Sequence, residues 1–363
     1  MSRNHRSIAI IGVYPPPLGG ISVHIERLCH VLENRGVPFI VIDGSGKPPD
    51  APVGFPIISV PAEQIERWCL RYVFRRNEKI VFNHFLRWKV RFFVSLLKLK
   101  GVKVVHTVHS YRSDDKYSLL ERMMIKLTGA LSDHFIAVTD EIKERLVRVG
   151  IPSRKISVIP AFIPPDETRE KPVIPEQVRT FFERHERVIV ANGGIGNEYA
   201  GADLYGADMC VESFIRLARK HPELGFLFCI THIVNENTLA QYQRRLEQAG
   251  LADRFCWIHE KMPLYPLLRQ AALFVRPTAS DGDALSIREA LHYGTPVVAS
   301  DAAKRPEGVI TFATRDLDDF TAKCELVLSG ATDRGTAPFP QTPLPSEQAQ
   351  YADRIIDILL GRH

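Results

Sequence analysis

The chain has 363 residues, of which 45% are hydrophobic and 25% charged, and its formal net charge is +5. This composition is ordinary for a soluble globular enzyme, and the length favours two α/β domains over one. No segment approaches the ~20 uninterrupted apolar residues that a membrane-spanning helix needs, which excludes an integral membrane protein of the helical type.

The cysteines and the N-terminus indicate a reducing compartment. No two of the six cysteines form a C-x-x-C pair, so we expect buried free thiols rather than disulfides or metal ligands. Residues 1–14 lack the shape of a signal peptide. We therefore expect a cytoplasmic protein, peripheral at most on the inner face of the cell membrane.

The first half of the chain alternates between apolar runs and helical patterns. Residues 7–13 are a continuous, mostly β-branched run, typical of a buried parallel strand, and a proline- and glycine-rich loop and a helical pattern follow it. Such alternation predicts a parallel sheet covered by helices. Further strands are predicted at residues 38–42, 79–82, 103–108, 135–138 and 156–159.

A proline-rich segment at residues 161–175 indicates a linker, after which the alternation restarts. The second set of strands is predicted at residues 188–191, 224–230, 255–258, 272–275 and 296–299, and a final helix at 347–360. We therefore predict two Rossmann-like, doubly wound α/β domains that face each other across a cleft, because ligands of open α/β sheets bind beyond the strand ends. The predicted boundaries are 1–165, 166–340 and a C-terminal tail, 341–363.

Residues 276–301 carry the most informative motif, RPTASDGDALSIREALHYGTPVVASD. A strand ends at Arg276, a loop with Asp281 follows, and a helix begins near Ser286 and carries Glu289. The start of a helix binds anions through free N–H groups, and a nearby carboxylate can accept hydrogen bonds from vicinal hydroxyls. A nucleotide sugar offers both groups. On spacing alone, a capping box formed by Ser286 and Glu289 is the favoured interpretation, and only the wider motif reverses this.

This motif resembles that of retaining glycosyltransferases of family GT4, which have the GT-B fold. The residues in register are Pro277, Thr278, Gly282, Glu289, Ala290, Gly294, Pro296, Val297 and Val298, and Asp281 stands where the family usually has glutamate. The resemblance implies that Glu289 holds the ribose hydroxyls and that Asp281 contacts the donor sugar. It also implies that backbone around Gly282, Asp283, Ala284, Leu285 and Ser286 faces the sugar and diphosphate.

The resemblance extends to the first domain. Gly19 and Gly20 look like the family's glycine loop, where backbone approaches a phosphate closely, although a simple turn has the same composition. His109, at the end of the strand KVVHTV, matches the family histidine that reaches the donor sugar from the opposite wall, with an exposed loop histidine as the alternative. His24 is interpreted as an ordinary helix residue.

One departure concerns the donor diphosphate. Family members place an arginine and a lysine in the first loop of the second domain, whereas this chain has small residues there, including Gly194. Unpaired phosphate charges in a cleft would cost several kcal/mol. We expect Arg276 and Arg288 to supply the charge, with Lys304 and Arg305 as weaker candidates.

Residues 67–103 hold eleven lysines and arginines and one acid, a local charge of +10, with aromatic residues between them. We predict an amphipathic helix at 85–99 that docks on an anionic membrane through Arg87, Trp88, Lys89 and Arg91. The alternatives are a solvated basic face over a core helix and, less favoured because no nucleic-acid motif accompanies the charge, a nucleic-acid surface.

Together these features predict an enzyme that transfers a sugar from a UDP- or GDP-sugar, with retention, to a lipid-linked glycan in exopolysaccharide or lipopolysaccharide synthesis. The resemblance implies no cofactor and no metal. Two alternatives remain: a nucleotide-sugar epimerase or hydrolase of the same fold, and a non-catalytic subunit that binds nucleotide sugars.

Overall fold

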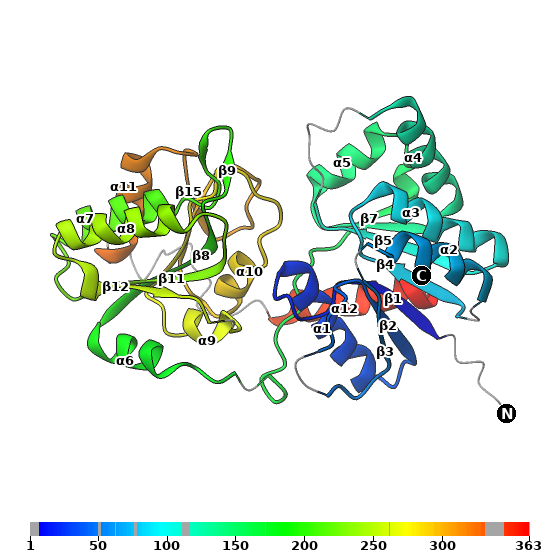
Figure 1. Cartoon of the computed structure of the whole chain (residues 1–363), viewed down its shortest axis with the longest axis horizontal. Coiled ribbons are helices and arrows are strands. Elements are labelled where there is room, and N and C mark those ends of the chain that lie inside the picture. The colour runs from blue at the N-terminus through cyan, green and yellow to red at the C-terminus, as the bar shows by residue number, and fades with distance from the viewer. Residues whose placement is uncertain are drawn as a thin grey trace. The chain divides into compact units, whose positions relative to one another are not determined.

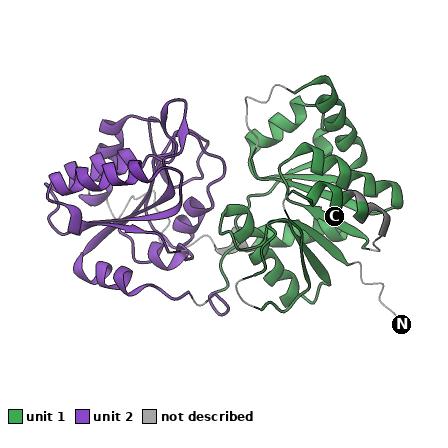
Figure 2. Cartoon of the chain, in the orientation of Figure 1, with its two compact units in different colours: residues 1–166, 346–363 green, residues 167–345 purple. Residues whose placement is uncertain are grey.

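The computed structural model describes residues 7–49, 52–61, 63–75, 78–110, 117–170, 172–260, 262–330 and 345–362. The chain forms two compact units: unit 1 comprises residues 1–166 and 346–363, and unit 2 comprises residues 167–345 (Figure 2). The first division falls next to the boundary predicted after residue 165. The boundary predicted after residue 340 lies outside the described residues.

Unit 1 is built on one parallel sheet with strand order β3-β2-β1-β4-β5-β6-β7, and helices lie on both faces (Figure 1). The strands are β1 (Ile8–Gly12), β2 (Phe39–Asp43), β3 (Ile57–Ser59), β4 (Ile80–Asn83), β5 (Lys103–Val108), β6 (His134–Ala137) and β7 (Ile156–Val158). The helices are α1 (Gly20–Asn34), α2 (Ile65–Arg75), α3 (Trp88–Ser95), η1 (Leu96–Lys100), α4 (Leu119–Leu131), α5 (Asp140–Arg148), η2 (Ser153–Lys155) and α12 (Pro345–Leu360).

Both faces of the central strand β1 are buried, which explains why its sequence is continuously apolar and does not alternate with polar residues. Side chains alternate between the two faces of a strand, and both faces of this sheet are covered. Ile8 and Ile10 pack in the cluster that contains residues of α1 and α12, whereas Ala9 and Ile11 pack in the cluster with α2 and α3. A continuous hydrophobic sequence is therefore what this position requires.

Unit 2 contains a second parallel sheet, with order β12-β11-β8-β13-β14-β15, and a small hairpin of β9 and β10. Its strands are β8 (Arg187–Ile195), β9 (Glu198–Tyr199), β10 (Ala202–Asp203), β11 (Leu224–Ile233), β12 (Phe255–Ile258), β13 (Leu273–Arg276), β14 (Val297–Ser300) and β15 (Val309–Phe312). Its helices are α6 (Glu176–Arg184), α7 (Ala207–Leu217), α8 (Glu236–Gln248), η3 (Ala252–Arg254), α9 (Tyr265–Leu268), α10 (Leu285–His292) and α11 (Leu317–Leu328).

The order of strands reverses beside the first strand of each unit. In unit 1, β1 lies between β2 and β4, and in unit 2, β8 lies between β11 and β13. Ligands of open α/β sheets bind beyond the carboxyl ends of the strands at such a reversal. The segments after β1, β4, β8 and β13 are therefore the places to search for a site.

The predicted strands are present, and four short strands were missed: the two-residue strands β9 and β10 of the hairpin, and β3 and β15 of the two main sheets. β3 and β15 lie at sheet edges, and their residues are largely half-buried or exposed, so neither carries a continuous buried run. The helix predicted at 85–99 is shorter, because α3 spans Trp88–Ser95 and continues as the 3-10 helix η1.

The structure corrects the predicted membrane contact at α3. Arg91 is 1% exposed, and its guanidinium lies over the ring of Trp88, 4.8 Å from the centroid. Trp88 itself packs against the buried cluster around Phe135, and Lys89 forms a 2.6 Å ion pair with Glu66. The prediction was wrong for Arg91, because α3 packs against the sheet, α2 and α4 with this residue buried. Trp88 is half-buried and Arg87 and Lys89 are exposed, so their membrane contact stays a prediction. No helix within the described ranges is long and apolar enough to cross a membrane.

The C-terminal helix α12 belongs to unit 1. Ala352, Ile355, Ile356 and Leu359 follow the i, i+3, i+4, i+7 spacing of one helix face, and all are buried in the cluster that contains Ile10. The chain therefore leaves unit 2 and completes the core of the first unit with its last helix.

We predict that Ile356→Ala destabilises unit 1 by about 2–5 kcal/mol, because the change leaves a cavity at the interface between α12 and the sheet. The measurement is urea unfolding of unit 1 by fluorescence in a Trp257→Phe background, where Trp68 and Trp88 report on unit 1. Gln350→Ala, an exposed position on the same helix, is the control. Equal effects of the two changes would show that α12 contributes no core packing.

Candidate functional site

The carboxyl ends of β8 and β13 place Arg276 beside Asn192. The two strands are neighbours, with Val275 opposite Ala191, so the next residues of each strand lie side by side where the sheet ends. Arg276 Nη1 donates to the backbone oxygen of Asn192 at 3.0 Å and to its side-chain oxygen at 3.1 Å. The guanidinium also lies 5.6 Å from the ring centroid of Tyr205. Arg276, predicted as a diphosphate ligand, is thus held in one orientation at the strand end.

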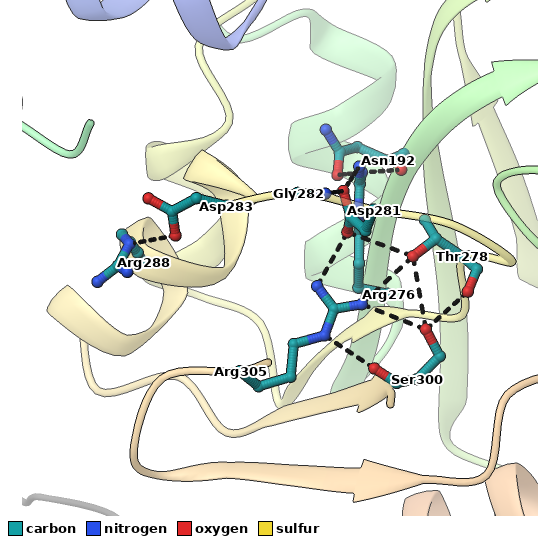
Figure 3. Close-up of polar contacts among 9 residues, drawn as sticks. All are labelled: Asn192, Arg276, Thr278, Asp281, Gly282, Asp283, Arg288, Ser300 and Arg305. Atoms are coloured by element: carbon teal, nitrogen blue, oxygen red, sulfur yellow. Dashed lines mark hydrogen bonds and ion pairs between the residues drawn. The ribbon is translucent and has the colours of Figure 1, made fainter. Parts of the chain in front are cut away.

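Asp281 joins this arginine to a second one (Figure 3). Its Oδ2 accepts from Arg276 Nε at 3.1 Å and from Arg305 Nη1 at 3.0 Å, and Oδ1 accepts from the amide of Gly282 at 3.0 Å. The side chain of Asp281 is only 10% exposed, and burial alone would raise its pKa. The two guanidiniums outweigh burial and lower the pKa of Asp281 to about 2, so the carboxylate is charged at neutral pH.

Arg305 lies at the centre of this network, although the sequence ranked it as a weaker candidate. Its side chain is 3% exposed and donates to the backbone oxygen of Ser300 at 2.8 Å, to Ser300 Oγ at 3.2 Å and to Thr278 Oγ1 at 3.3 Å. It therefore ties the loop after β14 to the loop after β13. The sequence signal was weak, since Arg305 lies five residues beyond its strand.

Helix α10 begins beside Asp281, at Leu285. Ala284 is the N-cap, and no side chain caps the helix, so Ser286 is the second helical residue and the proposed capping box with Glu289 does not form. Glu289 is 5% exposed and lies on the buried side of α10 with Ile287 and Ala290. Its position, one turn into a helix whose first amides lack a side-chain cap, is compatible with the predicted role toward a ribose.

Arg288, the other predicted phosphate ligand, is paired within its own segment. Its Nε donates to Asp283 Oδ1 at 2.6 Å, and the two side chains are 16% and 4% exposed (Figure 3). This ion pair links the loop before α10 to the helix. Arg276, with one aspartate shared between two arginines, is better placed than Arg288 to neutralise an anion.

The packing around β8 explains why the usual cations are absent. A Cβ on Gly194 would lie 2.6 Å from the ring of His232 and 2.4 Å from Asn197 Oδ1, and a Cβ on Gly193 would lie 2.6 Å from Tyr205. A side chain at Gly193 would run into the Cβ of Tyr205, and one at Gly194 would require His232 and Asn197 to move. Gly206 has φ +70°, and a Cβ there would meet the carbonyl oxygen of Pro277 at 2.1 Å. Tyr205 and His232 therefore fill the space at this strand end, which sequence reasoning did not identify.

Three histidines meet at the corresponding end of the sheet in unit 1. His24 comes from α1, His84 follows β4 and His109 follows β5, and their ring centroids lie 5.2–5.4 Å apart. His24 Nδ1 donates to the backbone oxygen of Ala161 at 2.6 Å, and His84 Nδ1 lies 3.0 Å from His109 Nε2. His109 is the least buried of the three, whereas His106 lies inside the core, bonded to Asn83, Ser95 and Ser132. The choice of His109 over His106 agrees with this geometry.

The histidine cluster is neutral at physiological pH. Burial lowers the pKa of His24 to about 4, with smaller effects of Ala161 and Arg27, and burial with the neighbouring histidines lowers the pKa values of His84 and His109. Because Nδ1 of His24 carries the proton, its Nε2 offers a lone pair. One nitrogen from each ring lies within 4.8 Å of the others, close enough to hold a metal ion. The expected metal independence remains a prediction.

The remaining predicted residues form the start of α1. Gly19 is the N-cap of α1, its amide donates to Ser22 Oγ at 2.9 Å, and Gly20 is the first helical residue. A Cβ on Gly19 would meet nothing within 4 Å, so the space beside this helix start is open.

Comparison with known proteins matches each unit to a glycosyltransferase family. Residues 18–167 match the family Glycosyltransferase Family 4, and residues 189–329 match Glycosyl transferases group 1. The chain is 34% identical, over 100 residues, to a lipopolysaccharide core biosynthesis mannosyltransferase of Rhizobium meliloti, covering 26% of this chain and 28% of that protein. It is 22% identical to a human protein that is one subunit of phosphatidylinositol N-acetylglucosaminyltransferase, covering 84% and 64%. The chain thus spans less than two thirds of each of these relatives.

Solved structures share the fold over almost the whole chain. HepE of Anabaena, solved with UDP and glucose, has a TM-score of 0.71 at 12% identity, with 98% of this chain and 100% of that chain covered. A structure from Listeria monocytogenes described as a UDP-N-acetylglucosamine 2-epimerase has a TM-score of 0.66 at 16% identity, with 98% and 96% covered. The GT-B fold predicted from the sequence is confirmed.

We predict that Arg305→Met destabilises unit 2 by about 3–5 kcal/mol, because the buried Asp281 loses one of its two cations. In an Asp281→Asn background, Arg305→Met should lower the free energy of unfolding by less, because no buried carboxylate then loses a cation. Trp257 fluorescence in urea, with Trp68 and Trp88 replaced by phenylalanine, measures the effect on unit 2. Lys304→Met, an exposed neighbour, is the control, and a cost for Arg305→Met no larger than this control would contradict the network.

We predict that unit 1 loses stability as the pH falls from about 6.5 toward 4. His24 has a pKa of about 4 when folded, below the ordinary value of 6.5, so the unfolded chain binds the extra proton in this window. At pH 5 this histidine alone should cost about 2 kcal/mol relative to pH 7.5. Urea unfolding in the Trp257→Phe background at several pH values measures the slope. An unchanged slope in His24→Gln would refute the assignment, and His232→Gln serves as the control.

Proposed function

The chain belongs to the glycosyltransferases, with a family 4 first unit and a group 1 second unit, and we propose that it transfers a sugar from a UDP- or GDP-sugar to a lipid-linked glycan. The observation that carries the proposal is the arginine–aspartate network at the strand reversal of unit 2, next to the start of α10. This arrangement combines positive charge, a helix start whose N-cap residue provides no side-chain cap, and a buried acid within one short segment.

The charges of the network match a nucleotide diphosphate. Arg276 and Arg305 share Asp281, so these three groups carry one net positive charge, whereas Arg288 and Asp283 neutralise each other. A helix N-terminus adds a partial positive charge. Arg276, the more exposed of the two arginines on Asp281, is the residue that we expect to contact the β-phosphate. Leaving-group charge develops on this phosphate as the bond to the sugar breaks, and preorganised donors stabilise it.

We propose two roles for Asp281: it orients Arg276 and Arg305, and it contacts the donor sugar. Three side chains donate to its Oδ2, which holds the carboxylate in one orientation. An aspartate here has one methylene fewer than the glutamate usual in the family, and its bonds to both arginines keep it close to the strand end. Glu289 is proposed to accept hydrogen bonds from the two ribose hydroxyls, and His109 to bond a sugar hydroxyl as a neutral imidazole.

The names of the relatives support the proposed acceptor, whereas retention and metal independence are carried over from the resemblance to family GT4. Two similar proteins have names that refer to lipopolysaccharide core biosynthesis and to phosphatidylinositol, and a lipid is part of each of the two named molecules. We therefore propose a lipid-linked acceptor in polysaccharide synthesis, transfer with retention and no metal requirement. A nucleotide-sugar epimerase shares the fold and is the alternative, and it would turn over the donor without any acceptor.

We predict that Glu289→Gln raises the dissociation constant for the nucleotide-sugar donor about 10- to 100-fold, because the change removes a charged hydrogen-bond acceptor for the ribose. The correct base is first identified by thermal stabilisation with a panel of UDP- and GDP-sugars, and binding is then measured by calorimetry. Glu247→Gln, on the exposed side of α8, is the control, and circular dichroism checks the fold. If Glu289→Gln and the parent protein bound the donor with equal affinity, the proposed role of Glu289 in donor binding would be contradicted.

A further inference from the structure

Helix α4 of unit 1 exposes a row of large apolar side chains. Leu119, Leu120, Met123 and Leu127 are 87%, 61%, 53% and 42% exposed. With 3.6 residues per turn, these positions fall within about 100° of the helix surface, so they form one stripe and not scattered residues. Single exposed leucines are common, but a stripe of four on one helix marks an interaction surface.

The stripe belongs to a helix that is fixed in place. The opposite side of α4 is buried through Ile125, Thr128 and Gly129. Ser118 caps the helix and accepts a hydrogen bond from the amide of Glu121, whose carboxylate binds back to Ser118. The apolar stripe is therefore surplus to the core that α4 already forms with α3 and the sheet, and Figure 1 shows α4 beside α3 in unit 1.

Cations flank the stripe. Arg122 and Lys126 are exposed and follow one another at i, i+4 along one side of the four apolar residues. The single acid of α4, Glu121, lies outside the stripe, and its carboxylate accepts hydrogen bonds from the amide and hydroxyl of Ser118. An exposed apolar stripe with basic residues along its edge is the pattern of a helix that lies in the interface of an anionic lipid bilayer.

We propose that α4 is the surface through which the protein docks on an anionic membrane, with Leu119, Leu120, Met123 and Leu127 in the acyl boundary and Arg122 and Lys126 at the lipid phosphates. This inference replaces the contact predicted at α3, whose apolar side and Arg91 are buried. It rests on the proposed function in one respect: a lipid-linked acceptor gives unit 1 a reason to lie on the bilayer.

The test is cosedimentation of the full chain with vesicles, in the absence of donor and acceptor. We expect binding to phosphatidylcholine vesicles that contain about 30% phosphatidylglycerol, weaker binding to phosphatidylcholine alone, and a loss of binding at high salt, since salt screens the cations. The triple change of Leu119, Leu120 and Met123 to glutamine should lower the partition coefficient at least about tenfold. The double change Arg122→Glu with Lys126→Glu should abolish the preference for anionic vesicles.

Matched controls separate this surface from general hydrophobicity and charge. Val173→Gln with Val234→Gln changes residues of unit 2 that are 87% and 63% exposed, and Arg87→Glu with Lys89→Glu changes the exposed cations of α3. Both pairs should bind vesicles like the parent protein. Because all α4 positions changed are exposed, the melting temperature should stay unchanged, which circular dichroism checks.

Three outcomes would overturn the proposal: no vesicle binding by the parent chain, equal binding of the α4 variants, or a dimer in sedimentation velocity that the glutamine variant dissociates, since α4 would then bind a second copy. Turnover of the donor with a water-soluble acceptor glycan tests the proposed function separately. Full turnover without vesicle binding would refute the docking surface alone, and vesicle binding without turnover would refute the proposed transfer to a glycan acceptor alone.

Discussion

The candidate site of unit 2 depends on a buried aspartate held between two arginines. Asp281 lies where β13 ends, and burial would favour its neutral form if Arg276 and Arg305 were absent. Removing a carboxylate from water costs several kcal/mol, and this cost is recovered only when both its oxygens are bonded and its charge is balanced. The network meets both conditions, and it leaves one positive charge at the place where a phosphate is expected.

The same interaction explains how the site tolerates a departure from its family. The side chains of Tyr205, His232 and Asn197 occupy the space beside Gly193 and Gly194, so a long cation at either position would have to displace them. Arginine at the end of the neighbouring strand can provide the charge instead, and its planar fork bonds Asn192 and Asp281 at the same time. A second arginine, Arg305, keeps this geometry fixed from the next loop.

The two units place different chemistry at equivalent positions of similar sheets. Unit 2 has charged groups at its strand reversal, whereas unit 1 has three imidazoles whose pKa values burial lowers. Neutral imidazoles can donate and accept hydrogen bonds, which suits sugar hydroxyls, and fixed charges suit a diphosphate. The contrast follows from burial, because three protonated histidines this close together in a core would repel one another.

The sequence alone determined the two parallel sheets, the place of the linker and the acidic motif, because continuous apolar runs, prolines and a contiguous motif are local features. Tertiary structure decided which side chains meet and which reach solvent. His106 lies inside the run 103–108 and His109 directly follows it, yet one lies in the core and the other at its edge. Arg305 binds an aspartate 24 positions away, the basic helix α3 is covered, and α4 exposes its leucines. These outcomes depend on how distant segments pack, which no local pattern encodes.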